Sequence, residues 1–185
     1  MNNSGTAERD DLSTSQSATD CYEGHEQWWA HSILFPDDYV IPPAGATWNW
    51  GVVMDFHHTG PTGQANFQVV SLPTGLVFQG FGGPTVANSP SDPGFYGASI
   101  GPVTKNAWYD FVYHVKWSSG SDGYFYAWVN GVQKLAHTGP TLYSGQGCYL
   151  KLANYHTAVG LPVSVIHDRV IRGTSAAAVA LTPLR

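Results

Sequence analysis

The dipeptide Asn130-Gly131 stands between two short strand-like runs, residues 124–129 and 132–136, and constrains the fold more than any other feature of the chain. Asn-Gly readily adopts the positive φ angles of a type I′ turn, which joins two antiparallel strands as a hairpin. The stretch just before it, residues 108–117, alternates with a period of two, as a strand with one buried face does. Its predicted apolar face is Tyr109, Phe111, Tyr113, Val115 and Trp117, and its other face is Asp110, Val112, His114 and Lys116.

Turn-forming residues separate the remaining strand-like runs at short intervals. Further strands are predicted over residues 26–35, 48–58, 66–71, 76–80, 149–156 and 163–172. We find no convincing amphipathic helix and no internal repeat. Such a succession predicts an all-β protein, an antiparallel two-sheet β-sandwich of the jelly-roll type. In that architecture one sheet can curve and expose a concave, polar and aromatic groove.

A long Gly-, Pro-, Ser- and Asn-rich stretch, residues 82–101, is predicted to be a loop. Loops of this length in a compact domain are usually functional or mobile. Phe95 and Tyr96 within it would either pack on a sugar ring or cover the core.

The length of 185 residues suits one domain with a core of its own. We expect a disordered arm over residues 1–8, the β-domain over residues 9–173 and a tail over residues 174–185. The formal net charge of −5 argues against nucleic acid or an anionic membrane as a partner. No apolar run approaches the roughly 18 residues of a membrane span, and we expect a monomer.

The N-terminal stretch, residues 1–17, is polar and does not have the pattern of a signal peptide. The two cysteines, Cys21 and Cys148, have no metal-binding spacing, so they form either one disulfide or two buried thiols. A disulfide between them would close a long loop and stabilise the folded chain by restricting the unfolded one.

Two of the predicted strands carry side chains suited to chemistry. In residues 149–156, Leu150 and Leu152 face a core, whereas Lys151, Ala153 and Tyr155 share the other face. An ordinary amphipathic strand with a solvated outer face has the same pattern. In residues 48–58, Trp48, Trp50, Val52, Met54 and Phe56 are predicted on one face and Asn49, Gly51, Val53, Asp55 and His57 on the other. Asp55 would there orient the His57 imidazole, and the alternative is a structural histidine at the end of a strand.

Several segments resemble, in order and spacing, the heparin-lyase-like polysaccharide lyases, which include glucuronan lyases. Arg9-Asp10-Asp11-Leu12 resembles an Arg-x-Glu-Leu element, and Asp55-Phe56-His57 resembles Gln-Trp-His. Further matching segments are residues 26–38, 100–103, 108–118, the Asn-Gly hairpin, 138–143 and 149–155. The resemblance covers roughly residues 8–173 and implies a concanavalin-like β-jelly roll.

The resemblance implies cleavage of a uronate polysaccharide by β-elimination. His57 matches the base of the family, Tyr155 the acid and Lys151 the substrate-binding lysine, and a nearby Lys charge would favour phenolate. The few cations suit a less charged polymer, such as glucuronan or alginate, better than heparin. No cofactor is required, and structural calcium is left unassigned because no loop is dense in oxygen ligands.

Other residues are weaker candidates for contact with the substrate. They are Arg9, Gln27, Asp55, Gln68, His58, His114, Lys116 and His156, whereas Asn154 alternates to the leucine face. Asp55 departs from the Gln of the family. Its charge would either orient His57 and raise the pKa of that imidazole, or repel a uronate.

Two other functions fit the same fold. A non-catalytic carbohydrate-binding module would bind glycans without releasing product. A glycoside hydrolase would need two opposed carboxylates, but Glu is scarce after Glu26. For a polysaccharide-degrading enzyme we expect an extracellular or periplasmic location.

Overall fold

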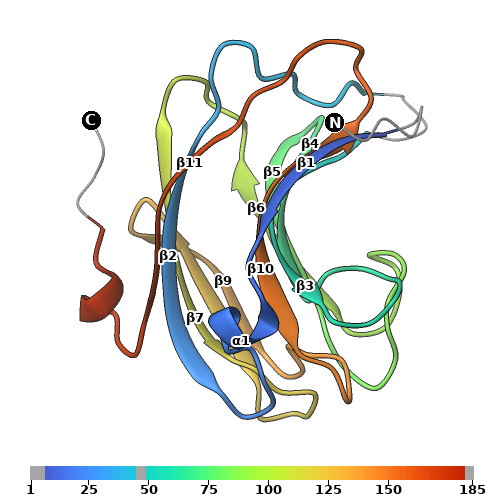
Figure 1. Cartoon of the computed structure of the whole chain (residues 1–185), viewed down its shortest axis with the longest axis vertical. Helices are drawn as coiled ribbons and strands as arrows, with labels where there is room; N and C mark the ends of the chain where they lie inside the picture. The colour runs from blue at the N-terminus through green and yellow to red at the C-terminus, as the bar shows by residue number, and fades with distance from the viewer. Residues whose placement is uncertain (1–6, 45–48, 182–185) are drawn as a thin grey trace.

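Two antiparallel sheets pack face to face in the computed structural model, which describes residues 7–44 and 49–181 (Figure 1). The six-stranded sheet has the order β1-β10-β3-β4-β5-β6, and the five-stranded sheet has the order β11-β2-β7-β8-β9. The predicted antiparallel β-sandwich is confirmed. The elements in chain order are β1 (Ala7–Ser13), α1 (Gln16–Thr19), β2 (Glu26–Leu34), β3 (Gly51–His58), β4 (Phe67–Leu72), β5 (Gly75–Phe81), β6 (Phe95–Gly101), β7 (Trp108–Lys116), β8 (Tyr124–Val129), β9 (Val132–Thr138), β10 (Cys148–Thr157), β11 (Ile166–Gly173) and the 3-10 helix η1 (Ala177–Val179).

An aromatic core fills the space between the sheets. The rings of Phe67 on β4 and Phe125 on β8 stack with centroids 3.8 Å apart and so join the two layers. Phe111 and Tyr113 of the alternating strand β7, and Trp117 directly after it, are fully buried in this core. Each such side chain contributes roughly 1.5–3 kcal/mol by its burial. The inner face predicted for residues 108–117 is therefore confirmed.

The Asn130-Gly131 turn joins β8 to β9 as predicted. Both residues have positive φ, 50° and 78°, which a type I′ turn requires. The Asn130 side-chain oxygen also accepts a hydrogen bond of 2.8 Å from the backbone N–H of Asp110. The turn thereby tethers the hairpin to β7.

A β-bulge in β3 overturns part of the predicted alternation. The register of β3 against β4 slips between Val52 and Met54, so that Val53 and Met54 both face the core. An extra residue reverses the facing of everything before it. Val52 and Trp50 consequently lie on the same face as Asp55 and His57, not on the opposite one. Trp48 lies outside the described residues.

The predicted loop over residues 82–101 is too long, because its last seven residues form the edge strand β6. Gly97 lets this strand approach β5 closely, since a Cβ there would stand 2.5 Å from the carbonyl oxygen of Phe78. Tyr96 is buried and stacks on His137 at 3.7 Å, so it covers the core. Phe95 remains 40% exposed.

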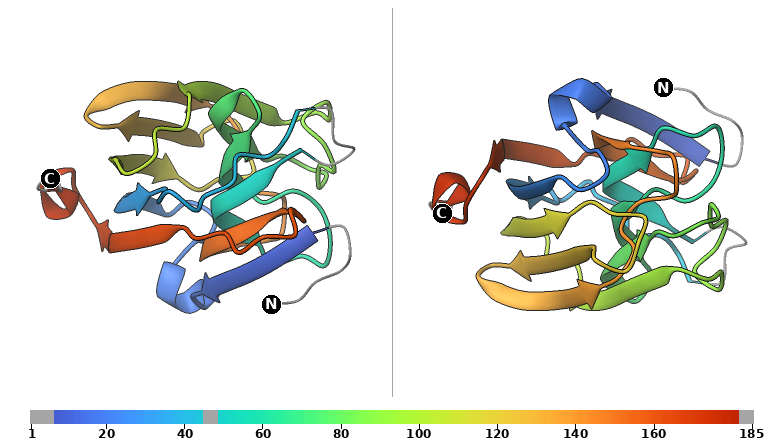
Figure 2. Two further views of the ribbon diagram at one scale, coloured as in Figure 1. Left: turned by 90° about the horizontal axis from the view of Figure 1, so that it is seen from above. Right: turned by 90° about the horizontal axis from the view of Figure 1, so that it is seen from below.

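The ends of the domain differ slightly from those predicted. β1 begins at Ala7 and pairs with β10 along its whole length, so residues 7 and 8 belong to the sheet. The rest of the predicted arm, residues 1–6, lies outside the described residues. In the tail, η1 buries Val179, and residues 182–185 are again not described. Figure 2 shows β1 at the edge of one layer and β11 at the edge of the other.

A disulfide joins Cys21 to Cys148. It ties the segment after α1 to the first residue of β10, the strand that carries Lys151 and Tyr155. Of the two alternatives for the cysteines, the bonded one is therefore correct. No helix in the described part of the chain is long and apolar enough to cross a membrane.

Candidate active site

A groove with a volume of about 440 Å³ runs over the outer face of the six-stranded sheet. The sheet bends, and its hollow side is turned away from the five-stranded sheet (Figure 1). Strands β1, β10, β3, β4 and β5 supply the floor, and the segment 63–65 and Pro90 lie along one side. The polar residues that line it are Arg9, Asn49, Asp55, His57, Gln64, Gln68, Gln79, Lys151 and Tyr155.

Strand register places the three catalytic candidates on one face. His57 pairs with Tyr149, and Lys151 pairs with Asp55, between the adjacent strands β3 and β10. Tyr155 lies further along β10, opposite Arg9 of β1. Because side chains alternate along each strand, all of these groups point away from the core. His57, Lys151 and Tyr155 are thus brought to a single groove.

The His57 imidazole is held by the backbone and not by a carboxylate. Its Nδ1 lies 2.9 Å from the carbonyl oxygen of His58, and a carbonyl only accepts, so Nδ1 carries the hydrogen. Nε2 then bears the lone pair. Burial lowers the pKa of His57 to about 4, although the bond to the His58 carbonyl opposes this. The ring is therefore neutral at pH 7. The expectation that Asp55 orients the imidazole and raises its pKa is wrong.

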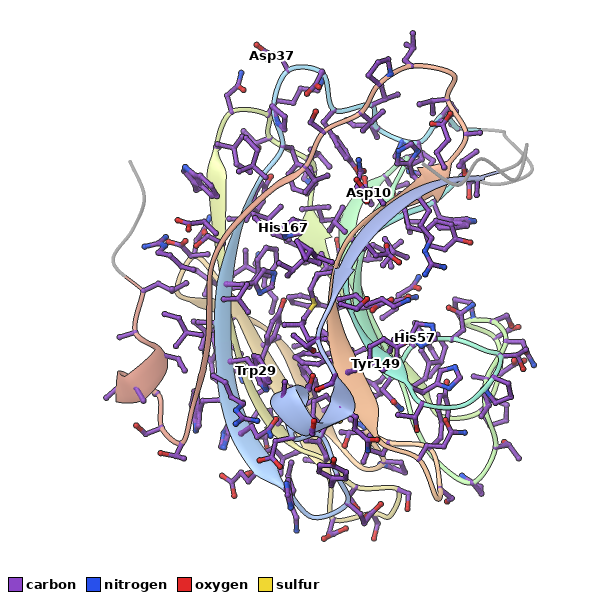
Figure 3. All side chains as sticks on the ribbon, viewed as in Figure 1. Asp10, Trp29, Asp37, His57, Tyr149 and His167 are labelled. Carbon is purple, nitrogen blue, oxygen red and sulfur yellow. A yellow bond between two sulfur atoms is a disulfide. The ribbon has the colours of Figure 1, made fainter. Side chains whose placement is uncertain are left out.

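Tyr149 packs beside His57. Its ring centroid lies 5.4 Å from that of His57, and Lys151 Nζ lies 5.6 Å from the same ring. Figure 3 shows His57 and Tyr149 next to each other on the side turned away from the five-stranded sheet. Tyr149 is not among the residues predicted from the sequence, although the alternation of β10 places it on the face of Lys151.

Two cations and a carboxylate form the wall built by β1 and β10. Arg9 Nε lies 2.5 Å from Asp11 Oδ2, and Lys151 Nζ lies 3.7 Å from the same oxygen. The Arg9 guanidinium also covers the Tyr155 ring at 5.4 Å, and Trp50 meets that ring edge-on at 4.7 Å. Tyr155 is thereby fixed between an arginine and a tryptophan, and the groove has a positive wall.

Asp55 lies two residues before His57 on β3, opposite Lys151 of β10, with only 6% of its surface exposed. Burial raises the pKa of Asp55 to about 7; Lys151 and Arg9 oppose the rise and Asp11 adds to it. A sizeable fraction of this carboxyl is therefore protonated at neutral pH.

Three amide side chains line the groove next to Asp55. Gln68 Nε2 donates to Gln64 Oε1 at 3.2 Å and to Gln79 Oε1 at 2.8 Å. Gln79 was missed by the sequence reasoning, but it pairs with Gln68 across the β4–β5 hairpin, which the spacing of the two runs could have revealed. Gln64 and Asn49 come from irregular segments and carry no such signal.

Gln27 does not reach the groove. It is 4% exposed within the core, where its Oε1 accepts hydrogen bonds from the indole N–H groups of Trp29 and Trp117, at 2.9 and 3.0 Å. Its Nε2 donates to the carbonyl oxygens of Thr19 and Asp20. Gln27 therefore does not act as a substrate contact in this arrangement, because all of its polar atoms have partners in the core.

Four other proposed substrate contacts lie outside the groove as well. His114 stacks on Trp28 at 4.1 Å on the outer face of the five-stranded sheet, and Lys116 on that face pairs with Asp122. His58 is fully buried, with Nδ1 2.9 Å from Gln146 Oε1. His156 is 7% exposed and bonds to the backbone of Thr157. Odd and even positions of a strand face opposite ways, so His58 and His156, which follow His57 and Tyr155, point away from the groove. His114 and Lys116 belong to the other sheet. Within residues 7–44 and 49–181, no three His, Cys, Asp or Glu side chains are grouped so as to hold a metal ion.

The two packed sheets, with titratable side chains across the concave one, place this molecule in the class of jelly-roll β-sandwiches. Within that class, the chain belongs to the polysaccharide lyase family, whose family model matches residues 2–171. The resemblance inferred from the sequence is thereby confirmed, and family membership supports a lyase enzyme.

Solved structures of lyases share this fold. An endo-β-1,4-glucuronan lyase from the fungus Trichoderma reesei superimposes with a TM-score of 0.71 at 17% identity, over 94% of this chain and 77% of the other. An alginate lyase from Pseudomonas aeruginosa gives a TM-score of 0.53 at 17% identity, over 90% and 74% of the two chains. An alginate lyase in complex with alginate trisaccharide gives a TM-score of 0.54 at 16% identity, over 89% of this chain and 73% of the other. A comparison with curated protein sequences finds no significant match.

Proposed function

We propose that this lyase cleaves a uronic-acid-containing polysaccharide, glucuronan-like or alginate-like, by β-elimination. The observation that carries the proposal is the meeting of His57, Lys151 and Tyr155 in one open groove. His57 is neutral with its Nε2 lone pair available, as a general base must be. Tyr155 supplies an O–H group on the same face.

The reaction follows from these roles. His57 Nε2 removes the proton from C5 of the uronate, and the electron pair forms the C4–C5 double bond as the bond from C4 to O4 breaks. Tyr155 gives its phenolic hydrogen to O4 of the leaving chain. Lys151 and Arg9 stabilise the negative charge that develops on the carboxylate attached to C5. Solvent exchange then returns the His57 proton to Tyr155.

The choice of polymer rests on charge and on the structural neighbours. Among the described residues, only Arg9 and Lys151 bring positive side chains to the groove, which suits one carboxylate per sugar better than additional sulfates. The neighbours are a glucuronan lyase and alginate lyases, one of them bound to alginate trisaccharide. The Cys21–Cys148 disulfide supports action outside the cytoplasm, because such bonds persist in oxidising compartments.

A panel of glucuronan, alginate, hyaluronan, heparin and pectate tests the proposal. Product formation is followed at about 235 nm, where the double bond made by general acid–base elimination absorbs. His57→Ala and Tyr155→Phe should each lower kcat by about 10²–10⁴-fold. His114→Ala, on the outer face of the other sheet, is the control and should retain activity. Glycan binding with no product from any polymer would instead indicate a carbohydrate-binding module, and full activity of both groove variants would exclude the proposed roles.

A further inference from the structure

We propose that Asp55 binds the C6 carboxylate of the substrate in its own protonated form, as a hydrogen-bond donor, and that this proton makes uronate binding depend on pH. The inference rests on the proposed function and adds a specificity-determining group to the same site. It assigns a role to a carboxyl that, if ionised, would repel the substrate it faces.

The neighbours of Asp55 leave one of its carboxyl oxygens without a donor. Among the described residues, its Oδ1 is buried and has no hydrogen-bond partner. Its cross-strand neighbour Gln68 uses both amide hydrogens on Gln64 and Gln79. Its other cross-strand neighbour, Lys151, has its ammonium 3.7 Å from Asp11. An ionised carboxylate would be costly in such a place, whereas a neutral carboxylic acid carries its own donor and can offer it to a ligand.

The charges of the groove also favour the protonated form of Asp55 when a uronate binds. Arg9 and Lys151 contribute two positive charges and Asp11 one negative charge, while His57 is neutral. With Asp55 protonated the groove has a net charge of +1, which one uronate carboxylate cancels. With Asp55 ionised the net charge is zero before substrate binds, and the incoming carboxylate meets a like charge.

Asp55 stands near His57, as a group that binds the C6 carboxylate of the substrate must. Asp55 and His57 are two residues apart on the same face of β3, which corresponds to roughly 7 Å of strand. The carboxylate of a uronate is bonded to C5, the carbon that His57 deprotonates. A donor for that carboxylate must therefore stand beside the base. An O–H to carboxylate bond is charge-assisted, and it strengthens further as charge moves onto the carboxylate in the transition state.

The surroundings of Asp55 also determine the pH at which its proton is lost. Burial raises the pKa of Asp55 to about 7, so a substantial part of the protein holds the proton at neutral pH. Asp11 adds to this rise, and Lys151 and Arg9 oppose it. The charged or titratable groups that face Asp55 are Lys151 and Tyr149 from β10, Arg9 and Asp11 from β1, and His57 from its own strand.

Binding of a glucuronan tetrasaccharide and an alginate tetrasaccharide to the inactive His57→Ala variant tests the inference by calorimetry at pH 5.5 and 8.5. Affinity should fall by roughly 30-fold at the higher pH, because only the protonated fraction of Asp55 is competent to bind. In the double variant with Asp55→Asn, the amide donates at both pH values, so the two affinities should agree within about twofold.

Two controls isolate the carboxyl–carboxylate contact. A carboxyl-reduced tetrasaccharide has no charge to recognise and should bind His57→Ala equally at both pH values. Asp11→Asn removes a neighbouring negative charge and should move the loss of affinity to lower pH without abolishing it. If Asp55→Asn does not fold, the comparison of intact and reduced sugars on His57→Ala decides by itself.

The inference is overturned if both tetrasaccharides bind equally at the two pH values, if neither binds at pH 5.5, or if Asp55→Asn keeps the pH dependence. These outcomes are separate from the failure of the proposed function. A wild-type protein that shows the expected binding and releases no unsaturated product would contradict the elimination and leave the role of Asp55 intact.

Discussion

The contact of His57 with a backbone carbonyl shows which ring nitrogen carries the hydrogen. Since the His58 oxygen holds the hydrogen of Nδ1, the other ring nitrogen is free to act as the base. Burial depresses the pKa to about 4, far below the usual value of 6.5, because the charged imidazolium is poorly solvated there. Two neighbouring cations, Lys151 and Arg9, act in the same direction. The proposed base is thus neutral at pH 7 without a carboxylate partner.

This depressed pKa predicts the acid limb of the pH–rate profile. The neutral form of His57 is the active one, so kcat/KM should rise as pH increases through about 4 and not near 6.5. Initial rates on the best polymer between pH 3 and 7 test this, with circular dichroism at each pH to show that the protein stays folded. A limb near 6.5 in the folded protein would mean that the imidazole is solvated or paired with a carboxylate.

Gln27 gives a second prediction at the scale of a single side chain. Gln27→Leu would leave the indole N–H groups of Trp29 and Trp117 and two backbone carbonyls without their partner. Each unsatisfied buried group costs about 1–3 kcal/mol, so the free energy of unfolding should fall by at least about 3 kcal/mol. Urea unfolding measures this. Gln133→Leu, on the exposed face of β9, should change stability by less than about 0.5 kcal/mol. The folded fraction of Gln27→Leu should keep its kcat/KM.

Among the elements, β3 and β10 decide the shape of the site. The register of β10 shifts against β3 between Leu152 and Tyr155, but it is continuous against β1, and Lys151 and Tyr155 both reach the groove as the sequence predicts. The bulge at Val53 has no local signature, since Val52, Val53 and Met54 are all apolar and either phase of the alternation is acceptable. The pairing of β3 with β4 determines which of these residues face the core. Trp50 therefore packs against Tyr155 in the groove and does not enter the core.

The strand β10 is also where the disulfide acts. Cys21 and Cys148 are 127 residues apart, and a cross-link over such a loop restricts the unfolded chain by about 5 kcal/mol in the chain-entropy model. We expect the double substitution Cys21→Ser with Cys148→Ser to lower the free energy of unfolding by about this amount, measured by urea titration. Adding reductant to the wild type should reproduce the loss, and adding it to the double variant should change nothing. Equal stability of the two proteins would show that the bond constrains little.

For the whole molecule, charge is the property that bears on substrate choice. The net charge of −5 repels polyanions at a distance, and the positive groups of the groove are Arg9 and Lys151 within the described residues. Two cations neutralise only a small part of the charge of a sulfated glycan, whereas the net negative charge of the protein repels all of it. From this charge distribution we expect heparin to bind weakly, although the sequence resembles heparin-lyase-like proteins.

Size-matched tetrasaccharides test this expectation on His57→Ala. Heparin tetrasaccharide should bind roughly tenfold more weakly than glucuronan tetrasaccharide at low ionic strength, because of long-range repulsion. Raising the salt concentration should narrow the gap, since screening shortens the reach of the net charge. Tighter binding of heparin would point to basic groups that the groove does not include.

The sequence by itself determined the two-sheet architecture, the hairpin at Asn130-Gly131, the aromatic inner face of β7 and the shared face of Lys151 and Tyr155. These follow from a period of two along each strand and from turn chemistry, which are local properties of consecutive residues. It also indicated His57, through a motif whose spacing is local.

Only the tertiary structure decided which polar side chains enter the groove and in what protonation state. Gln27, His58, His114, Lys116 and His156 look equivalent to Arg9 and Gln68 in the sequence, but the register between strands sends the first five to the core, to the loops or to the far sheet. The proton on Asp55 likewise depends on burial and on charges from β1 and β10. Register and desolvation arise from contacts between residues far apart in the chain, and for that reason no local pattern could contain them.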